Sequence, residues 1–218
     1  MTILAFEFSS AQRSVAVARR LAIGKAPGLS EVIETGTISG DALGMTQQVL
    51  SQAGVEREKI ECVAVGLGPG SYHGIRTAIA LAQGFQLARG VKLLGISSVE
   101  CLAAQAQAEG IVGRIHFVID AQRGEFYVAR YDLSEVDTKI VDPLRLVNRT
   151  ELAEMAASGT VLGPEAPRWI PQARDFFPRA ATLARLALDR TDFIAGEKLT
   201  PIYLRETSFA KAPQPGQK

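Results

Sequence analysis

The chain has few of the residues that build reactive or cross-linked sites: two cysteines, two histidines and one tryptophan among 218 residues. Cys62 and Cys101 lie in apolar surroundings, so we expect two buried free thiols and neither a disulfide framework nor a metal-type spacing. His73 and His116 form no His-x-x-x-His pair, and no Gly-x-Ser-x-Gly nucleophile motif is present. We therefore expect no metal site, no cofactor and no catalytic residues.

The chain also lacks an excess of charge of either sign. Lys and Arg together number 24 and Asp and Glu 23, which gives a net charge of +1, and both halves are close to neutral. Because affinity for nucleic acid grows with the number of phosphates neutralised, we expect weak nucleic-acid binding by the chain alone. The aromatic residues are not interleaved with basic ones, so a stacking platform for single strands is not expected.

Long hydrophobic runs are missing as well. No stretch approaches the roughly 20 apolar residues that cross a bilayer. Residues 1–7 contain no basic region before a long apolar run, so they do not resemble a signal peptide. Apolar residues make up 47% of the chain, as in ordinary globular proteins. These features predict a soluble, cytoplasmic protein without membrane contact.

Hydrophobic periodicity predicts an α/β protein in which strands and helices alternate. Strands are expected at residues 3–8, 14–19, 32–37, 62–66, 92–96, 114–119 and 201–204. Helices are expected at residues 41–53, 71–89, 98–108, 149–157 and 181–189. Gly54 and Gly90 are placed to end the first two helices.

Two short matches indicate an internal duplication. They pair Ala11-Gln12-Arg13 with Ala121-Gln122-Arg123, and Val17-Ala18-Arg19 with Val128-Ala129-Arg130. Each lies in a strand-turn-strand pattern, after an acidic residue at the end of the first strand, Glu7 or Asp120. Chance similarity is the alternative. Duplication predicts two similar α/β lobes, residues 1–110 and 111–205, followed by a mobile tail at 206–218.

The sharpest local signal is a glycine-rich segment, residues 66–76, between a predicted buried strand and a predicted helix. Such a turn can direct backbone N–H groups and the positive helix end toward an anion. The lysine of a Walker loop is missing, and a tight strand-to-helix corner is the alternative. Ser71 can cap the helix, and Gly74 allows close backbone approach. The motif residues are Gly68, Pro69, Gly70, Ser71 and Gly74.

The two predicted hairpins carry the second signal. In actin-like and sugar-kinase-like ATPases, the first hairpin of each lobe has an aspartate that holds a metal-bound water and small turn residues that let backbone amides reach phosphate. Here the first hairpin reads Glu7-Phe8-Ser9-Ser10-Ala11, and it has no glycine. Phe8 is expected to be a bulky obstruction at the point where phosphate would need access to the backbone. The second hairpin reads Asp120-Ala121-Gln122-Arg123-Gly124. The sequence therefore predicts the architecture of an ATPase without autonomous ATP hydrolysis.

The first two predicted helices are apolar over so much of their surface that they need cover on two sides. Small residues at Ala80, Gly84 and Ala88 would let another helix approach closely. We therefore predict that both helices bury a shared face against another subunit; the alternative is that both are simply core helices. The predicted interface residues are Leu43, Met45, Thr46, Val49, Leu50, Arg76, Thr77, Ala80, Gln83, Gly84 and Leu87.

Four segments of the chain match the motifs of one known family. They are Gly68-Pro69-Gly70-Ser71-Tyr72-His73-Gly74-Ile75-Arg76, Leu94-Gly95-Ile96-Ser97-Ser98-Val99-Glu100, Asp120-Ala121-Gln122-Arg123-Gly124-Glu125-Phe126-Tyr127 and Pro201-Ile202-Tyr203-Leu204-Arg205. Together they resemble the TsaB (YeaZ) family, whose pattern reads Gly-Pro-Gly-Ser-Phe-Thr-Gly-Leu-Arg, Gly-Val-Ser-Ser-Leu-Glu, Asp-Ala-Arg-x-Gly-Glu-Val-Tyr and Pro-x-Tyr-Leu-Arg. The chain departs from it at Glu7-Phe8-Ser9, where the family has Asp-Thr-Ser, at residues 38–41, where the family often has His-Ser, and at His73.

The resemblance implies a duplicated actin-like (ASKHA, RNase H-like) fold with a mixed sheet and flanking helices in each lobe. It also implies a non-catalytic subunit that forms a heterodimer with the catalytic TsaD subunit, which transfers threonylcarbamoyl to the adenosine beside the tRNA anticodon. An ATPase, TsaE, joins that assembly. Contact with tRNA would be indirect, and the isolated chain would form a homodimer. The alternatives are an independent kinase of the same fold, a peptidase, or a plain homodimeric scaffold.

Overall fold

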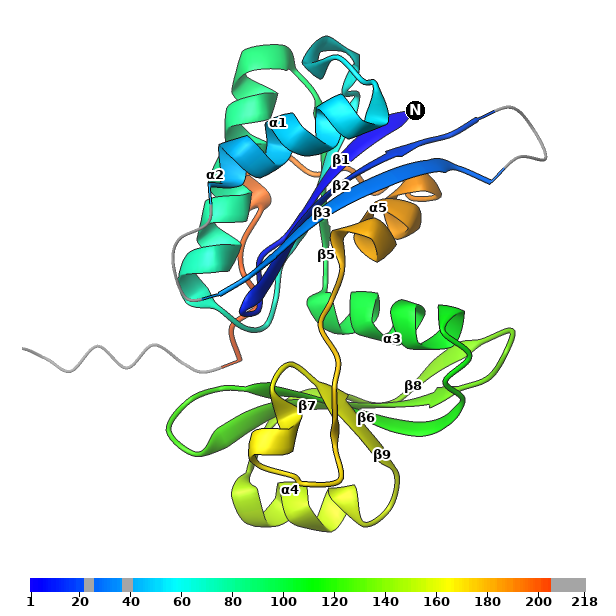
Figure 1. The fold of residues 1–218 in the computed structure, drawn as a ribbon. Coiled ribbons are helices and arrows are strands. Elements are labelled where there is room, and N and C mark those ends of the chain that lie inside the picture. The colour runs from blue at the N-terminus through cyan, green and yellow to red at the C-terminus, as the bar shows by residue number, and fades with distance from the viewer. Residues whose placement is uncertain (22–25, 37–40, 205–218) are drawn as a thin grey trace, which may run out of the picture.

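The structure, a computed structural model, describes residues 1–21, 26–36 and 41–204, which form two lobes (Figure 1). In these residues there is one five-stranded sheet in each lobe. The first sheet consists of β1 (Thr2–Glu7), β2 (Gln12–Arg19), β3 (Gly28–Thr35), β4 (Cys62–Gly66) and β5 (Lys92–Ile96). The second consists of β6 (Gly113–Asp120), β7 (Glu125–Leu133), β8 (Thr138–Asn148), β9 (Thr160–Gly163) and β10 (Arg174–Asp175).

The two sheets share one topology. The strand order is β3-β2-β1-β4-β5 in the first and β8-β7-β6-β9-β10 in the second. In each sheet the first three strands pair antiparallel, and the fourth and fifth are parallel to the first strand of the lobe. The same order with the same directions confirms the predicted duplicated actin-like fold.

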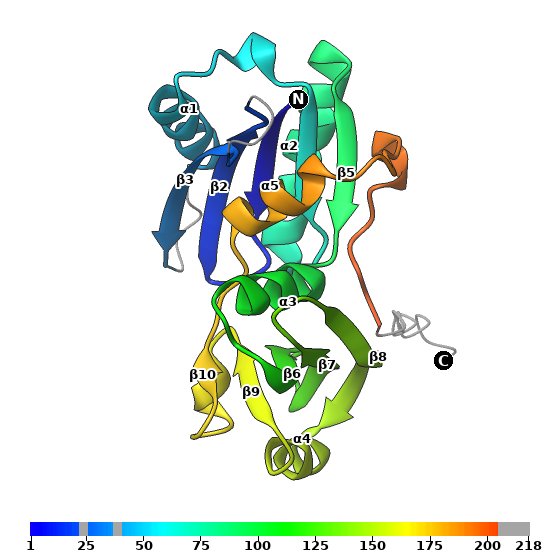
Figure 2. The ribbon, with the colours of Figure 1, turned by 90° about the vertical axis from the view of Figure 1, so that its right-hand side faces the viewer.

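The first lobe has three layers. Side chains of β1 alternate between two cores, as the pleat of a strand requires. Leu4 and Phe6 join the core under α1 (Ala42–Ala53) and α2 (Tyr72–Arg89), whereas Ile3 and Ala5 join the core under α5 (Ala180–Leu188). Both faces of the sheet are therefore covered by helices, with α5 on the face opposite α1 and α2 (Figure 2).

The second lobe is covered by α3 (Ser98–Ala108) on one face of its sheet and by α4 (Arg149–Ala156) on the other. Figure 2 shows α3 between the two lobes. This helix follows β5 of the first sheet but packs on the second, and α5 follows the second sheet but packs on the first. Short 3₁₀ helices lie at η1 (Arg57–Lys59), η2 (Ala166–Arg168) and η3 (Gly196–Lys198).

The helix ends of the first lobe agree with the sequence. Ser71 caps α2 by accepting a hydrogen bond from the N–H of Gly74 at 3.3 Å, and Asp41 caps α1 in the same way. Gly54 and Gly90 follow the two helices with φ of 59° and 66°, the left-handed region that glycine enters at little cost. These predictions succeed because a cap depends on only a few neighbouring residues.

The lobe boundaries differ from those predicted at 1–110 and 111–205, because the chain crosses between the lobes twice. Helix α3 contributes Val99, Leu102, Ala103 and Ala106 to the core of the second lobe. Residues 180–204 return to the first lobe, where Ile194 forms a bridge with Leu93 and the N–H of Ile202 donates to the carbonyl of Leu67 at 2.9 Å. Residues 201–204 form no strand, contrary to the prediction. The predicted tail at 206–218 lies outside the described residues.

Candidate functional site

The glycine-rich segment forms the corner between β4 and α2, and it packs directly on the turn that follows β1. The N–H of Ser71 donates to the carbonyl of Ser9 at 2.7 Å. A side chain at Gly70 would overlap with that same carbonyl, and one at Gly74 would overlap with the carbonyl of Phe8. The N–H of Gly68 donates to Ser98 Oγ at 3.1 Å. These amides donate hydrogen bonds to groups of the same chain. This agrees with the alternative that the segment is a tight strand-to-helix corner.

Glu7, the acidic residue of the first hairpin, lies under this corner and is completely buried. Its Oε1 accepts from the N–H of Ser9 at 2.9 Å, and its Oε2 accepts from Ser98 Oγ at 2.9 Å. Burial raises the pKa of the carboxyl, although its hydrogen bonds to Ser9 and Ser98 oppose the rise. A side chain at Gly66 would overlap with the carboxylate. Glu7, at the end of β1, therefore connects the turn at Ser9, the end of β4 at Gly66 and the start of α3 at Ser98.

Phe8 does not have the position that the sequence suggested. Its side chain is 1% exposed and packs edge-on against Phe6, with ring centroids 5.8 Å apart. The ring belongs to the core between the first sheet and helices α1 and α2. The expectation that Phe8 obstructs the mouth of the hairpin is wrong, because strand alternation directs this side chain inward.

The second hairpin keeps its acidic residue closer to solvent. Asp120 is half-buried, and its two oxygens accept from the backbone N–H and the side-chain amide of Gln122, each at 2.8 Å. Gln122, Arg123 and Gly124 all have positive φ, at 65°, 60° and 77°. Such backbone strain in two non-glycine residues fixes a sharp turn that projects the Arg123 side chain.

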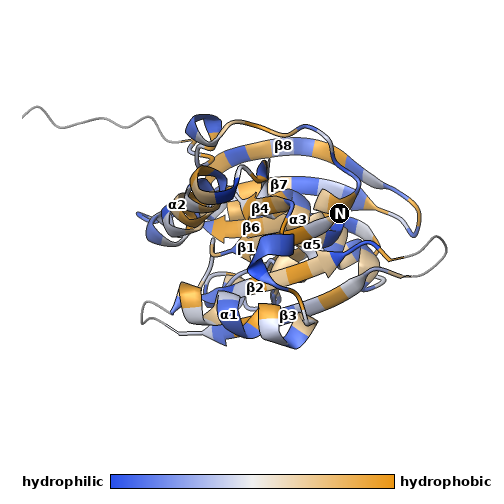
Figure 3. Ribbon diagram, turned by 90° about the horizontal axis from the view of Figure 1, so that it is seen from above, coloured by the Kyte–Doolittle hydropathy of each residue, from blue (hydrophilic) through white to orange (hydrophobic). Residues whose placement is uncertain are grey.

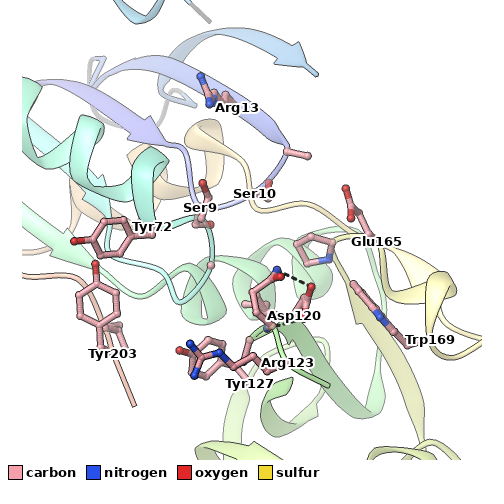
Figure 4. Close-up of a pocket in the computed structure, with 18 of the residues that line it drawn as sticks. Ser9, Ser10, Arg13, Tyr72, Asp120, Arg123, Tyr127, Glu165, Trp169 and Tyr203 are labelled. Carbon is pink, nitrogen blue, oxygen red and sulfur yellow. Dashed lines mark hydrogen bonds between the residues drawn. The ribbon is translucent and has the colours of Figure 1, made fainter. Parts of the chain in front are cut away.

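A cleft of about 850 Å³ separates the two hairpin turns (Figure 4). Residues from both lobes and from the returning C-terminal segment line it. Figure 4 shows Tyr72 and Tyr203 on one side and Trp169 on the other, with Arg123 and Tyr127 between them in this view. The Tyr72 and Tyr203 rings stack with centroids 5.8 Å apart and an interplanar angle of 28°. Burial raises the pKa of the Tyr203 hydroxyl, and Tyr72 adds to that effect.

Sequence reasoning missed this cleft, because its lining residues are brought together only by the fold. A usable signal was present: Tyr72, Tyr127 and Tyr203 each lie in a different one of the four quoted motifs. The predicted motif residues Gly70 and Ser71 also line the cleft, whereas Gly68, Pro69 and Gly74 do not.

The predicted interface residues of α1 fall on two sides of that helix. Met45, Thr46, Val49 and Leu50 are buried in the core shared with the first sheet and α2. Their assignment to a partner surface is wrong, because the sheet of the same lobe already covers them. Leu43 lies on the outer side and is 62% exposed. Figure 3 shows both hydrophobic and hydrophilic segments on α1 and α2.

The predicted interface residues of α2 lie mainly on the outside. The exposed ones are Arg76, Thr77, Ala80, Gly84 and Leu87. Leu87 is 91% exposed, and a side chain added at Gly84 would meet no atom within 4 Å. Gln83 is half-buried and donates to the carbonyl of Gly196 at 2.8 Å, so it fixes η3. We refer to the five exposed residues as the outer face of α2.

The cysteines are buried free thiols, as the sequence predicts. Cys62 and Cys101 are buried and unpaired, and burial raises the pKa of the Cys62 thiol to about 12. His116 is completely buried on β6, whereas His73 is exposed at the start of α2. Within the described ranges, no three His, Cys, Asp or Glu side chains gather to hold a metal ion. No helix there has the length and apolar character of a membrane span.

Comparisons with known proteins lead to the same family as the sequence motifs. A family model described as "TsaD: tRNA N6-adenosine threonylcarbamoyltransferase" matches residues 39–160. The tRNA threonylcarbamoyladenosine biosynthesis protein TsaB of Escherichia coli K12 is 27% identical over 195 residues, which cover 78% of this chain and 82% of that protein. The TsaB of Haemophilus influenzae is 29% identical over 134 residues, which cover 60% of this chain and 53% of that protein.

Solved structures agree with the sequence relatives. A Pseudomonas aeruginosa protein described as similar to peptidase YEAZ superposes with a TM-score of 0.75 at 27% identity, and covers 94% of this chain and 99% of its own. The structure described as YeaZ from Pseudomonas aeruginosa also has a TM-score of 0.75, at 25% identity, and covers 93% of this chain and 99% of its own. The chain thus belongs to the family of the matching TsaD model, and within it to the TsaB (YeaZ) group.

Proposed function

We propose that this chain is a non-catalytic subunit in the synthesis of threonylcarbamoyladenosine in tRNA, and that it acts by binding a TsaD-like catalytic subunit. The names of its relatives in Escherichia coli and Haemophilus influenzae place those proteins in this biosynthesis. The matching family model describes the transferase. A paralogue that keeps the fold of a transferase and offers a docking surface fits a supporting role.

The outer face of α2 is the observation that carries the proposal. Leu87 is 91% exposed, so burial against a partner would remove its apolar surface from water. Ala80 and Gly84 leave the helix backbone accessible, so another helix can approach closely. Leu43 of α1 is a second exposed leucine of the first lobe. The isolated chain would use this face for its homodimer.

The two hairpin carboxylates support the absence of catalysis. In an actin-like ATPase these groups hold a metal-bound water in the cleft. Glu7 is instead buried beneath the corner and bound to Ser9 and Ser98. Asp120 is bound to both donors of Gln122. Neither carboxylate is positioned to receive a metal ion and phosphate without rearrangement. Binding of tRNA is assigned to the partner, since the chain carries a net charge of only +1. A TsaE-like ATPase completes the proposed assembly.

The proposal predicts that Ala80→Arg abolishes association with a TsaD-like partner. A stable interface buries on the order of 1,600 Å², and an unpaired arginine at its centre costs several kcal/mol, about a thousandfold in affinity. Ala80 is exposed, so the monomer should remain folded. Analytical ultracentrifugation with the purified partner measures association, and thermal melting measures folding.

Ala153→Arg is the matched control. It makes the same substitution at an exposed position of α4 in the second lobe. It should leave association unchanged. The proposal fails if Ala80→Arg stays folded and binds the partner as the native chain does. Loss of homodimer alone, with partner binding intact, would point to the scaffold alternative for this face.

A further inference from the structure

The second lobe buries a histidine that is part of neither the cleft nor the outer face of α2. His116 lies on β6 and has no solvent exposure. Its side chain points to the face of the sheet that α4 covers, because Val118, two residues further along the strand, belongs to the core under α4. The charge of a histidine changes near neutral pH, so a completely buried one makes its surroundings sensitive to acid.

The chain passes directly over the imidazole ring where α4 ends and β9 begins. Ser158 Oγ lies 3.3 Å from Nε2 of His116. The Cβ of a side chain at Gly159 would lie 3.1 Å from two atoms of the ring and 2.8 Å from the carbonyl oxygen of Arg114. A residue without a side chain is therefore needed for the backbone to come this close. We call residues 155–162 the α4–β9 junction.

The hydrogen bonds of the junction define which ring nitrogen carries the hydrogen. Ser158 donates its single hydroxyl hydrogen to the carbonyl of Met155 at 2.8 Å. Ser158 Oγ therefore accepts at its contact with His116, and the ring hydrogen is assigned to Nε2. Nδ1 then carries a lone pair, and it has no hydrogen-bond partner among the described residues. Protonation would turn this atom into a buried donor without an acceptor, which is costly.

The charged groups beside the ring also oppose protonation. Arg130 of β7 is the direct cross-strand partner of His116, and Arg114 precedes His116 by two residues on β6. Arg130 pairs with Asp142 of β8 at 3.0 Å, and Arg114 pairs with Asp132 of β7 at 3.6 Å. Burial lowers the pKa of His116, and Arg130 and Arg114 lower it further, whereas Asp142 raises it. The α4–β9 junction brings a hydroxyl group and a glycine to the ring, neither of which titrates.

We propose that His116 is an acid-sensitive latch, which keeps the α4–β9 junction closed while its ring is neutral and releases the junction when its ring is protonated. The neutral ring donates to Ser158 and fits beneath the junction. The protonated ring adds a positive charge beside two arginines and a buried N–H group without an acceptor. Opening of the junction lets water solvate both. This inference does not depend on partner binding by the outer face of α2.

The latch controls a small part of the molecule. α4 contributes Leu152 and Ala156 to the core on its side of the second sheet, whereas α3 covers the other side through a separate core. Figure 1 shows α4 at the end of the second lobe that is remote from the first lobe. The junction can therefore open while α3 and the first lobe stay folded, as a local event of low cost.

Hydrogen exchange of the native chain at pH 7.5 and pH 5.5 tests the latch. The open junction lets His116 take up a proton near its ordinary pKa of about 6.5, whereas the closed junction resists it. Opening should therefore become about tenfold more frequent over this pH range. The protection factors of amides 155–162, corrected for the intrinsic exchange rate at each pH, should fall by that factor.

Low concentrations of urea separate local opening from global unfolding. Local opening exposes little surface, so exchange of amides 155–162 at pH 5.5 should not respond to urea below the unfolding transition. Exchange in β1, a central strand of the first sheet, should rise with urea because it requires global unfolding. If exchange of amides 155–162 rises as steeply with urea as exchange in β1, the junction opens only with the whole chain, and the latch is overturned.

Two histidine variants identify the group that titrates. His116→Gln cannot take up the proton, so the tenfold difference between the two pH values should disappear from amides 155–162. His73→Gln is the matched control, because it removes the only other histidine, which is exposed at the start of α2, and it should keep the difference. The native-chain experiment does not require either variant to fold. Equal protection of the native junction at both pH values, or a tenfold difference that persists in folded His116→Gln, would contradict the proposal.

Discussion

The two lobes share a strand order, but they differ in how deeply the acidic residue at the end of the first strand is buried. In the first lobe the acidic residue, Glu7, is completely buried, and the turn after it is covered by the corner before α2. In the second lobe Asp120 is only half-buried, and the turn after it borders the cleft. The same topology therefore buries the carboxylate completely in one lobe and leaves it at the cleft in the other, although Ser9, Ser10 and Ala11 of the first turn also line the cleft.

The element between the fourth and fifth strands accounts for the difference. In the first lobe it is α2, an 18-residue helix whose first turn lies against the backbone of Phe8 and Ser9. In the second lobe the corresponding segment contains η2, a 3₁₀ helix of only three residues. A long helix can press its N-terminal turn onto the hairpin, whereas a single 3₁₀ turn leaves the hairpin exposed. Duplicated lobes can thus diverge in function by the length of one connection.

The largest expected effect comes from Gly74→Ala. The new methyl group would overlap with the carbonyl of Phe8, which is backbone and cannot move aside as the end of a flexible side chain could. We expect a loss of about 3 kcal/mol or more in the free energy of unfolding. Urea denaturation of the purified variant measures it.

Two glycine variants calibrate that result. Gly84→Ala lies in the same helix with open space around it, and should stabilise by about 0.5–1 kcal/mol. Gly124→Ala, in the exposed turn of the second lobe, meets no atoms but has φ of 77°, and should cost only about 1–2 kcal/mol. If Gly74→Ala costs no more than Gly124→Ala, the contrast between a covered and an exposed hairpin is incorrect.

A smaller effect is expected when the two acidic residues are removed. Glu7→Ala leaves the N–H of Ser9 and the hydroxyl of Ser98 without their partner, which should cost about 2 kcal/mol near pH 4.5. Asp120→Ala removes hydrogen bonds from a solvent-accessible turn and should cost less than about 1 kcal/mol.

The cost of Glu7→Ala should depend on pH. Burial raises the folded-state pKa of this carboxyl above its ordinary value of about 4.5, so the folded chain holds the proton more tightly than the unfolded chain. The stability that the neutral carboxyl provides is complete below that ordinary value and is lost as pH rises through the folded-state pKa. Urea denaturation from pH 4.5 to 8 should show the advantage of native chain over variant shrinking. An advantage that grows with pH would contradict the buried position.

The sequence predicts most of the first lobe because its signals are local. Strands at 62–66 and 92–96 are short apolar runs bounded by turn residues, and the structure has them at the same bounds. β8 was missed because it is an edge strand whose residues are mostly half-buried or exposed, and it contains Pro143. Its apolar residues therefore give neither a continuous run nor a regular alternation.

The candidate site could be predicted less completely from the sequence than the fold. Periodicity shows which residues share a side of α1, but it does not show whether that side meets its own sheet or another chain. For this reason Met45 and Val49 were assigned to a partner, although the core contains them. The cleft needs residues from three distant segments, and only the duplicated fold brings Tyr72, Tyr127 and Tyr203 together. Their identity as tyrosines is visible in the sequence, but their proximity is not.

The smallest expected effect concerns the buried titratable group of the second lobe, His116, and it should have the opposite sign. Burial lowers the pKa of this histidine, and the positive charges of Arg130 and Arg114 lower it further. The unfolded chain therefore binds the proton more readily than the folded chain. Stability from the neutral imidazole is complete above its ordinary pKa of about 6.5, and is lost as pH falls toward the folded-state value.

His116→Gln should remove this pH dependence while keeping a polar side chain near Ser158, whose Oγ lies 3.3 Å from His116 Nε2. Between pH 8 and pH 5.5 we expect the native chain to lose up to about 1 kcal/mol more stability than the variant. Glu7→Gln, in the first lobe, should change the pH profile in the opposite direction, which makes it the matched control. Urea denaturation at several pH values measures both. If His116→Gln and the native chain lose stability in parallel below pH 6.5, burial and the two arginines do not lower the pKa of His116.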